Sequence, residues 1–139
     1  MRGVVMTAPG IIEVTDREEP AIVEPTDAVI RLAATCVCGS DLWPYRGIGG
    51  PVDHQAMGHE YVGVVEEVGD AVRTVKPGDF VVGSFCYSDN TCEICRSGYQ
   101  SRCVHGGFIS DVGTQAERAR IPQADGTLVA TPGAPAPDL

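Results

Sequence analysis

Residues 58–83, GHEYVGVVEEVGDAVRTVKPGDFVVG, contain two valine-rich runs that are bounded by turn-forming residues. The first run, Tyr61–Val68, lies between two glycines. The second, Phe80–Val82, follows Lys76-Pro77-Gly78-Asp79, in which proline and glycine favour a turn. Short runs of β-branched residues between turn signals are typical of β-strands. The stretch therefore predicts two strands.

The rest of the chain follows the same pattern. Further β-prone runs between Pro and Gly signals predict strands at Val4–Met6, Ile11–Val14, Ala28–Thr35, Ala119–Ile121 and Leu128–Ala130. A helical turn is expected only at Gly39–Tyr45, where Pro44 limits its length. The pattern predicts a mainly β domain, either a barrel or a sandwich.

Composition narrows the class of protein. A length of 139 residues fits one domain, and 43% apolar with 21% charged residues is ordinary for a globular fold. The net charge of −9 argues against nucleic-acid binding, which needs a basic face. No apolar run approaches the ~20 residues of a membrane helix, and the first residues do not resemble a secretory signal. We therefore expect a cytoplasmic protein with no membrane partner.

Two segments fit no strand. Residues 83–107 hold four of the six cysteines and show little apolar periodicity, so we expect a metal to order a lobe at about residues 84–107. Residues 131–139, TPGAPAPDL, are rich in proline and are expected to form a connector after a domain spanning residues 1–130.

The cysteine cluster has the spacing of a metal site. Two-residue gaps let neighbouring donors meet one tetrahedral ion, and the set of candidates is Asp89, Cys92, Cys95 and Cys103. With four protein ligands the site would be closed, and its role structural. One alternative is cysteines that bind no metal, and another is a disulfide between them. Disulfides are rare in a reducing compartment. Cys86 lies outside the regular spacing and is expected to be a small core residue.

A second group combines a thiol, an imidazole and a carboxylate. Cys38 and His59 are suitable zinc donors, and Glu60 is a further ligand or a neighbour of the metal. Asp41 is placed to accept a ring N–H of His59. The plain alternative is a surface His–Glu pair. Cys36 is an alternative to Cys38, because alternation along a strand puts both on one side.

The residues of this second group resemble a known family. Residues 58–72, GHEYVGVVEEVGDAV, match the signature of the zinc-containing alcohol dehydrogenases within the medium-chain dehydrogenase/reductase family. Cys38-Gly39-Ser40-Asp41 is similar to that family's catalytic cysteine motif, and His59 follows it at the family's separation. The similarity extends through residues 76–83 and the late run GTQAERARIPQADGTLVATP, so it covers nearly the whole chain.

The resemblance implies a fold and a set of roles. The fold is a GroES-like, partly open β-barrel with short helical turns and a zinc-ordered lobe. Cys38 and His59 match the catalytic zinc ligands, and Glu60 the neighbour that approaches the metal. Ser40 matches the hydroxyl that hydrogen-bonds the substrate oxygen, and Asp41 the carboxylate that orients the histidine. The four residues of the cysteine cluster match the structural zinc site.

Three departures from the family pattern are evident. Asp89 occupies a position that is commonly Cys. Trp43 stands where many relatives carry a histidine of the proton relay, and it is expected to line the substrate pocket instead. The family's third catalytic ligand is expected beyond Leu139.

The resemblance also implies NAD or NADP as the cofactor of the complete enzyme, and a small alcohol, aldehyde or ketone as its substrate. No G-x-G-x-x-G follows a predicted strand, so the nucleotide-binding domain is expected outside this sequence. The isolated chain is then expected to be inactive, and the complete enzyme a homo-oligomer. The rival hypotheses are a stand-alone zinc-binding interaction module, a zinc-free reductase of the same superfamily and a zinc ribbon for nucleic acid.

Overall fold

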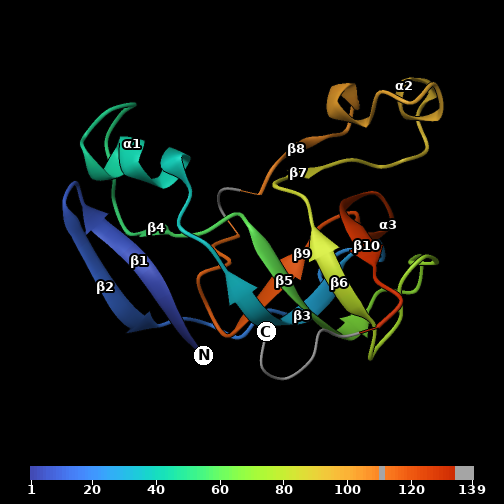
Figure 1. Ribbon diagram of the computed structural model, residues 1–139, viewed down its shortest axis with the longest axis horizontal. Helices are drawn as coiled ribbons and strands as arrows, with labels where there is room; N and C mark the ends of the chain where they lie inside the picture. Colours follow the sequence, from blue (N-terminus) through green and yellow to red (C-terminus); the bar gives the residue numbers. More distant parts are fainter. Residues whose placement is uncertain (110–111, 134–139) are drawn as a thin grey trace.

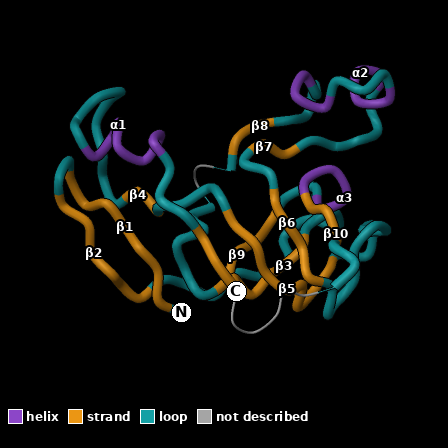
Figure 2. The backbone as a smooth tube through the Cα atoms, in the orientation of Figure 1, coloured by secondary structure: helices purple, strands orange, loops and turns teal. Residues whose placement is uncertain are grey.

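The computed structural model describes residues 1–109 and 112–133. The outer part of the predicted connector, residues 134–139, lies outside the described residues. Within the described ranges the chain folds into antiparallel β-sheets with short helical turns, as Figures 1 and 2 show.

The main sheet has five strands in the order β10-β6-β5-β3-β9. Their bounds are β3 Ala28–Thr35, β5 Tyr61–Val68, β6 Phe80–Gly83, β9 Arg118–Ile121 and β10 Leu128–Ala130. All neighbouring strands run antiparallel, and the two outer strands, β9 and β10, are not paired with each other. The sheet is therefore open, in agreement with the predicted partly open barrel.

A smaller sheet lies beside the main sheet. It has the order β2-β1-β4, with bounds β1 Arg2–Ala8, β2 Ile11–Asp16 and β4 Gln55–Ala56. One isolated bridge, between Gly3 and Ala116, connects β1 to the segment that precedes β9. The short helical turns η1, Gly39–Asp41, and α1, Leu42–Tyr45, lie over this sheet in Figure 1 and fall where a helical turn was predicted.

The core is the buried face of the five-stranded sheet. The largest fully buried aliphatic side chains on its strands are Ile30, Val65, Val81 and Ile121, and Ile109, which lies outside these strands, belongs to the same buried cluster. Alternate residues of β5 are buried from Tyr61 to Val65, as expected for a strand with one face in the core. The Tyr61 ring packs against Gly83 of β6, where any Cβ would overlap the ring.

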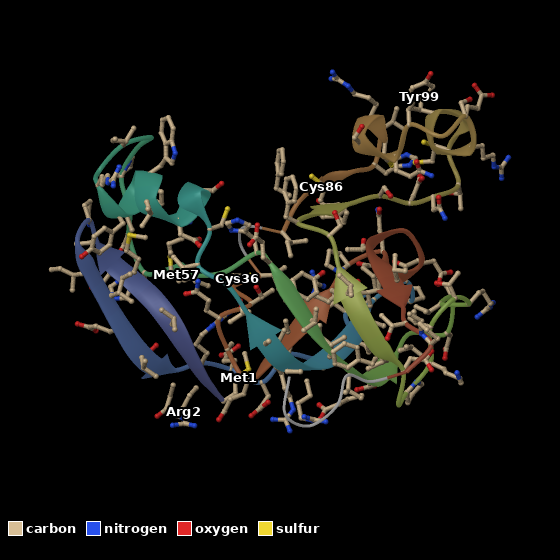
Figure 3. All side chains as sticks on the ribbon, viewed as in Figure 1. Met1, Arg2, Cys36, Met57, Cys86 and Tyr99 are labelled. Atoms are coloured by element: carbon tan, nitrogen blue, oxygen red, sulfur yellow. The ribbon has the colours of Figure 1, made fainter. Side chains whose placement is uncertain are left out.

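The lobe projects from the main sheet at the upper right of Figure 1. It contains α2, Glu93–Arg96, and η2, Gln100–Arg102, and a two-stranded sheet of β7, Cys86–Tyr87, and β8, Gly107–Phe108, closes its base. In Figure 3, Tyr99 lies at the outer part of the lobe and Cys86 where it joins the core. The expectation that residues 83–107 contain no strand was wrong at both ends, because Gly83 ends β6 and Cys86–Tyr87 pairs with Gly107–Phe108.

A helical turn was expected only at Gly39–Tyr45, and this was wrong: α2 and η2 of the lobe and the single turn α3, Ala124–Thr127, are helical as well. The strand β4 was also not predicted. All four elements are too short for periodicity to reveal. Cys86, expected in the core, is only half-buried on β7.

Candidate functional site

Strand pairing brings the first group of candidate ligands together. Thr35 at the end of β3 pairs with Tyr61 at the start of β5, so the segments that follow β3 and precede β5 share one end of the sheet. Cys38 lies in the first segment and His59 and Glu60 in the second. One potential donor atom from each of these three side chains lies within 4.8 Å of the others, and all three are half-buried.

Only glycine fits the backbone position before His59. Gly58 has a φ of +97°, a region that side chains disfavour, and a Cβ there would overlap the backbone nitrogen of Gln115. Its carbonyl accepts the N–H of Thr114 at 3.0 Å, and Met57 O accepts the N–H of Gln115 at 2.9 Å. These bonds hold His59 and Glu60 against the segment before β9.

Asp41 connects the two segments of the group. It is 7% exposed, its Oδ2 accepts the N–H of Cys38 at 2.8 Å, and its Oδ1 lies 3.5 Å from Nδ1 of His59. A proton on Nδ1 that faces this carboxylate leaves the Nε2 lone pair as a metal donor. The carboxylate therefore positions both the loop that carries Cys38 and the imidazole ring.

The two thiols of the TCVC sequence differ in position. Cys38 belongs to the group with His59 and Glu60, and its Sγ lies 3.5 Å from the exposed Ser40 Oγ. Cys36 is exposed, and a hydrogen bond with the Glu60 carboxylate is the main reason that the pKa of its thiol is raised. Figure 3 shows Cys36 on the segment that leaves β3. Among the described residues, the structure thus places Cys38, and not Cys36, in the group that could hold a metal with His59 and Glu60.

Aromatic side chains adjoin this group. The His59 ring meets Phe85 edge to face with centroids 6.5 Å apart, and Phe85 stacks on Phe108 at 6.1 Å. A mainly apolar groove of about 380 Å³ next to Glu60 and Cys36 has Phe85 in its wall. Sequence reasoning did not identify either phenylalanine, since no local pattern places them beside His59. Trp43 on α1 is 62% exposed, and its place in a substrate pocket remains a prediction.

The second group lies in the lobe, where local turns converge. One potential donor atom each from Asp89, Cys92, Cys95 and Cys103 lies within 4.8 Å of the others. Cys92 caps α2, and its Sγ accepts the N–H of Cys95 at 3.4 Å. The N–H of Asp89 donates to Cys103 Sγ at 3.4 Å, and Cys95 is only 2% exposed. Of the four residues only Cys95 is buried, and the other three are half-buried.

Ionisation in the lobe follows from its hydrogen bonds. His105, and then the N–H groups of Thr91 and Cys92, donate to the Asp89 carboxylate and hold its pKa well below the usual range. Backbone donors lower the pKa of Cys92. Burial raises the pKa of the Cys95 thiol to about 12. A bound cation would reverse this last effect, since metal ligands bind as thiolates.

His105 was also not identified from the sequence. Its Nδ1 lies 2.5 Å from Oδ2 of Asp89, and the same hydrogen bond raises the pKa of the imidazole. It follows Cys103 by two positions, and this proximity to the cysteine cluster was the available signal.

Comparison with known proteins identifies the family. The model of the alcohol dehydrogenase GroES-like domain matches residues 24–133. The chain is 42% identical to the zinc-type alcohol dehydrogenase B of Aspergillus flavus and 42% identical to the medium chain reductase/dehydrogenase ucsI of an Acremonium species, in each case over 95% of this chain. It spans 32% and 47% of the lengths of those two relatives.

Solved structures agree with the family match. The alcohol dehydrogenase TADH from Thermus sp. ATN1 superposes with a TM-score of 0.87 at 34% identity, covering 99% of this chain and 42% of that one. The zinc-dependent alcohol dehydrogenase 2 from Streptococcus pneumonia gives a TM-score of 0.84 at 37% identity, covering 95% of this chain and 39% of that one. The chain therefore belongs to the family of alcohol dehydrogenase GroES-like domains, within the zinc-type medium-chain alcohol dehydrogenases.

Proposed function

We propose that this chain is the zinc-binding, substrate-side domain of an NAD(P)-dependent alcohol dehydrogenase that interconverts a small alcohol and its carbonyl product by hydride transfer. The observation that carries the proposal is the convergence of Cys38, His59 and Glu60 within 4.8 Å, with Asp41 behind the imidazole. The family match and the zinc-type relatives support it.

The donor chemistry of both groups suits zinc. A thiolate, an imidazole and a carboxylate can hold the ion while one position stays open, whereas the O/S₃ set of the lobe closes a tetrahedral site. When bound at the open site, the metal supplies a Lewis acid that polarises the substrate oxygen. The lobe would hold its ion for structure, because all its donors come from within residues 89–103.

The residues around the open site would position the substrate and move its proton. Ser40 Oγ, exposed and adjacent to Cys38 Sγ, is placed to accept the proton of the alcohol hydroxyl and to release it to water. Asp41 would keep the His59 ring in one orientation and tautomer. Trp43 stands where many relatives have a relay histidine, and the proposed route therefore passes directly from Ser40 to solvent.

The nicotinamide would be held by a separate nucleotide-binding domain of the complete enzyme. Every strand pair among residues 1–109 and 112–133 is antiparallel, whereas a dinucleotide-binding βαβ unit needs parallel strands. We therefore expect this chain alone to be inactive. None of the helices in this part of the protein has the length and apolar content for a membrane crossing.

A chimera tests the reaction. Residues 1–133 of this chain would replace the matching segment of the Aspergillus flavus relative, and reduction of NAD and of NADP would be followed with a series of small alcohols. We expect turnover that His59→Ala and Cys38→Ser each reduce at least ~100-fold, because each variant removes a proposed metal ligand. Cys86→Ser, outside both ligand groups, is the matched control and should keep the activity.

Metal analysis separates the proposal from its main rival. A stand-alone zinc module would bind metal in the lobe alone, so the chimera would show no turnover and His59→Ala would leave its metal content unchanged. A folded chimera whose turnover is insensitive to His59→Ala would contradict the proposal.

A further inference from the structure

His105 makes the shortest polar contact to the lobe group. Its Nδ1 lies 2.5 Å from Asp89 Oδ2, and since a carboxylate accepts, the ring nitrogen is the donor. The other oxygen, Oδ1, accepts the N–H groups of Thr91 at 2.9 Å and Cys92 at 3.1 Å. Among the described residues, His105 is therefore the only nitrogen donor to Oδ2, and the carboxylate adjoins three thiols.

The backbone of His105 is itself anchored to the core. Its carbonyl accepts from Gln123 Nε2 at 3.1 Å. Gln123 precedes α3 with a φ of +48°, a conformation that directs the chain into this turn. The His105 side chain is 66% exposed. A continuous path of hydrogen bonds thus runs from Gln123 through His105 to Asp89.

An aspartate needs such support more than a cysteine would. Its carboxylate rotates about a soft terminal torsion and offers two oxygens, so several orientations compete unless hydrogen bonds select one. A thiolate has one donor atom and no such freedom. Groups that orient a metal ligand typically change metal affinity by about 10- to 100-fold.

We propose that His105 is a positioning residue for the lobe metal: by holding Oδ2, it orients the Asp89 carboxylate as the fourth ligand beside the three thiolates. The inference rests on the proposed metal-binding role of the lobe. It also predicts that His105 becomes dispensable once residue 89 is a cysteine.

The test compares five variants of the 139-residue chain, with Asp89→Ala as the variant that lacks the carboxylate. Co²⁺ and Zn²⁺ affinities are measured in competition with a chelator, together with the Co²⁺ absorption spectrum. His105→Ala should weaken binding by about 10- to 100-fold and shift the visible Co²⁺ bands, because the carboxylate loses its orientation. His105→Asn, whose side-chain amide can occupy the place of Nδ1, should keep affinity within about threefold. Asp89→Cys should bind tightly, and adding His105→Ala to it should change nothing.

Three results would overturn the inference. The first is unchanged affinity and spectrum in His105→Ala. The second is an equal loss for His105→Ala in the Asp89→Cys background, which would mean that His105 acts on the fold of the lobe. The third is full binding by Asp89→Ala together with loss in His105→Ala, which would make the histidine itself the ligand. In each case the wild-type lobe still binds metal, so the proposed lobe function survives. A wild-type lobe that binds neither ion would overturn both.

Discussion

At the scale of single residues, Asp41 has two partners that belong to different parts of the chain. It accepts the N–H of Cys38 and lies 3.5 Å from Nδ1 of His59, and its carboxylate is nearly buried. An acceptor in this position selects the tautomer of the ring as well as its orientation. The position of Cys38 and the tautomer of His59 thus depend on one side chain.

Asp41→Asn separates these two roles. The amide oxygen can still accept from Cys38, but an amide N–H that faces Nδ1 favours the opposite His59 tautomer. We expect ¹⁵N-resolved NMR of the imidazole to show the change and metal affinity at this group to fall by about 10- to 100-fold. Wild-type tautomer and affinity in Asp41→Asn would refute the positioning role. Asp53→Asn, beside the exposed His54, is the matched control.

At the scale of elements, the contact between β5 and β6 depends on a glycine beneath an aromatic ring. Gly83→Ala would drive a methyl group into the Tyr61 ring, and overpacking of this kind typically costs about 1–3 kcal/mol. Urea unfolding measures the free energy of unfolding of the variant. Gly133→Ala, where a Cβ would meet nothing within 4 Å, should stay within about 0.5 kcal/mol of wild type. A Gly83→Ala variant as stable as wild type would show that the Tyr61 ring moves aside without cost.

The turn α3 is attached to the loop after β5 through Asp125. Its carboxylate accepts the backbone N–H of Arg73 at 2.9 Å and of Thr74 at 2.8 Å. Burial alone would raise the pKa of Asp125, but these hydrogen bonds outweigh it and lower the pKa. A lowered folded-state pKa stabilises the fold above the unfolded value of about 3.9, and the stabilisation is lost as pH falls through the folded pKa.

Asp125→Asn should therefore be less stable than wild type at pH 7 by about 1 kcal/mol, a small value because the group is partly exposed. The difference should shrink as the pH is lowered below about 4. Thermal unfolding of both proteins with chelator present, from pH 3 to pH 7, measures it without a contribution from metal. A difference that is constant across this range would contradict the assignment.

At the scale of the whole molecule, the two ligand groups differ in how they are built. The lobe takes four donors from residues 89–103, whereas the Cys38 group takes three from segments that only the sheet brings together. A closed site holds zinc tightly, and a site with fewer protein donors leaves the ion accessible to water and chelators.

We therefore expect about one zinc per chain after brief dialysis against a mild chelator, with the remaining ion in the lobe. Elemental analysis gives the count, and loss of that ion in Cys92→Ser, but not in Cys38→Ser, gives its location. Two tightly retained zincs would show that Cys38, His59 and Glu60 suffice as ligands.

The strands and the lobe spacing were predictable because they depend on neighbours in the chain. Alternation and turn residues predicted Ala28–Thr35 and Tyr61–Val68 at their observed bounds. The cysteine spacing predicted a group that the structure assembles with local turns. The GHE signature indicated the family, which the comparisons confirm.

The tertiary structure decided the contacts that depend on pairing between segments far apart in the chain. The antiparallel register of β3 and β5 brings Cys38 rather than Cys36 into the group with His59, and alternation along the strand could not distinguish these thiols. The contact of His105 with Asp89 likewise requires β7 to pair with β8 at the base of the lobe. The sequence by itself determined elements whose free energies come from residues a few positions apart. Sites whose residues lie far apart in the chain required the packed sheet, since only its cooperative formation offsets the entropy of closing the long loops between them.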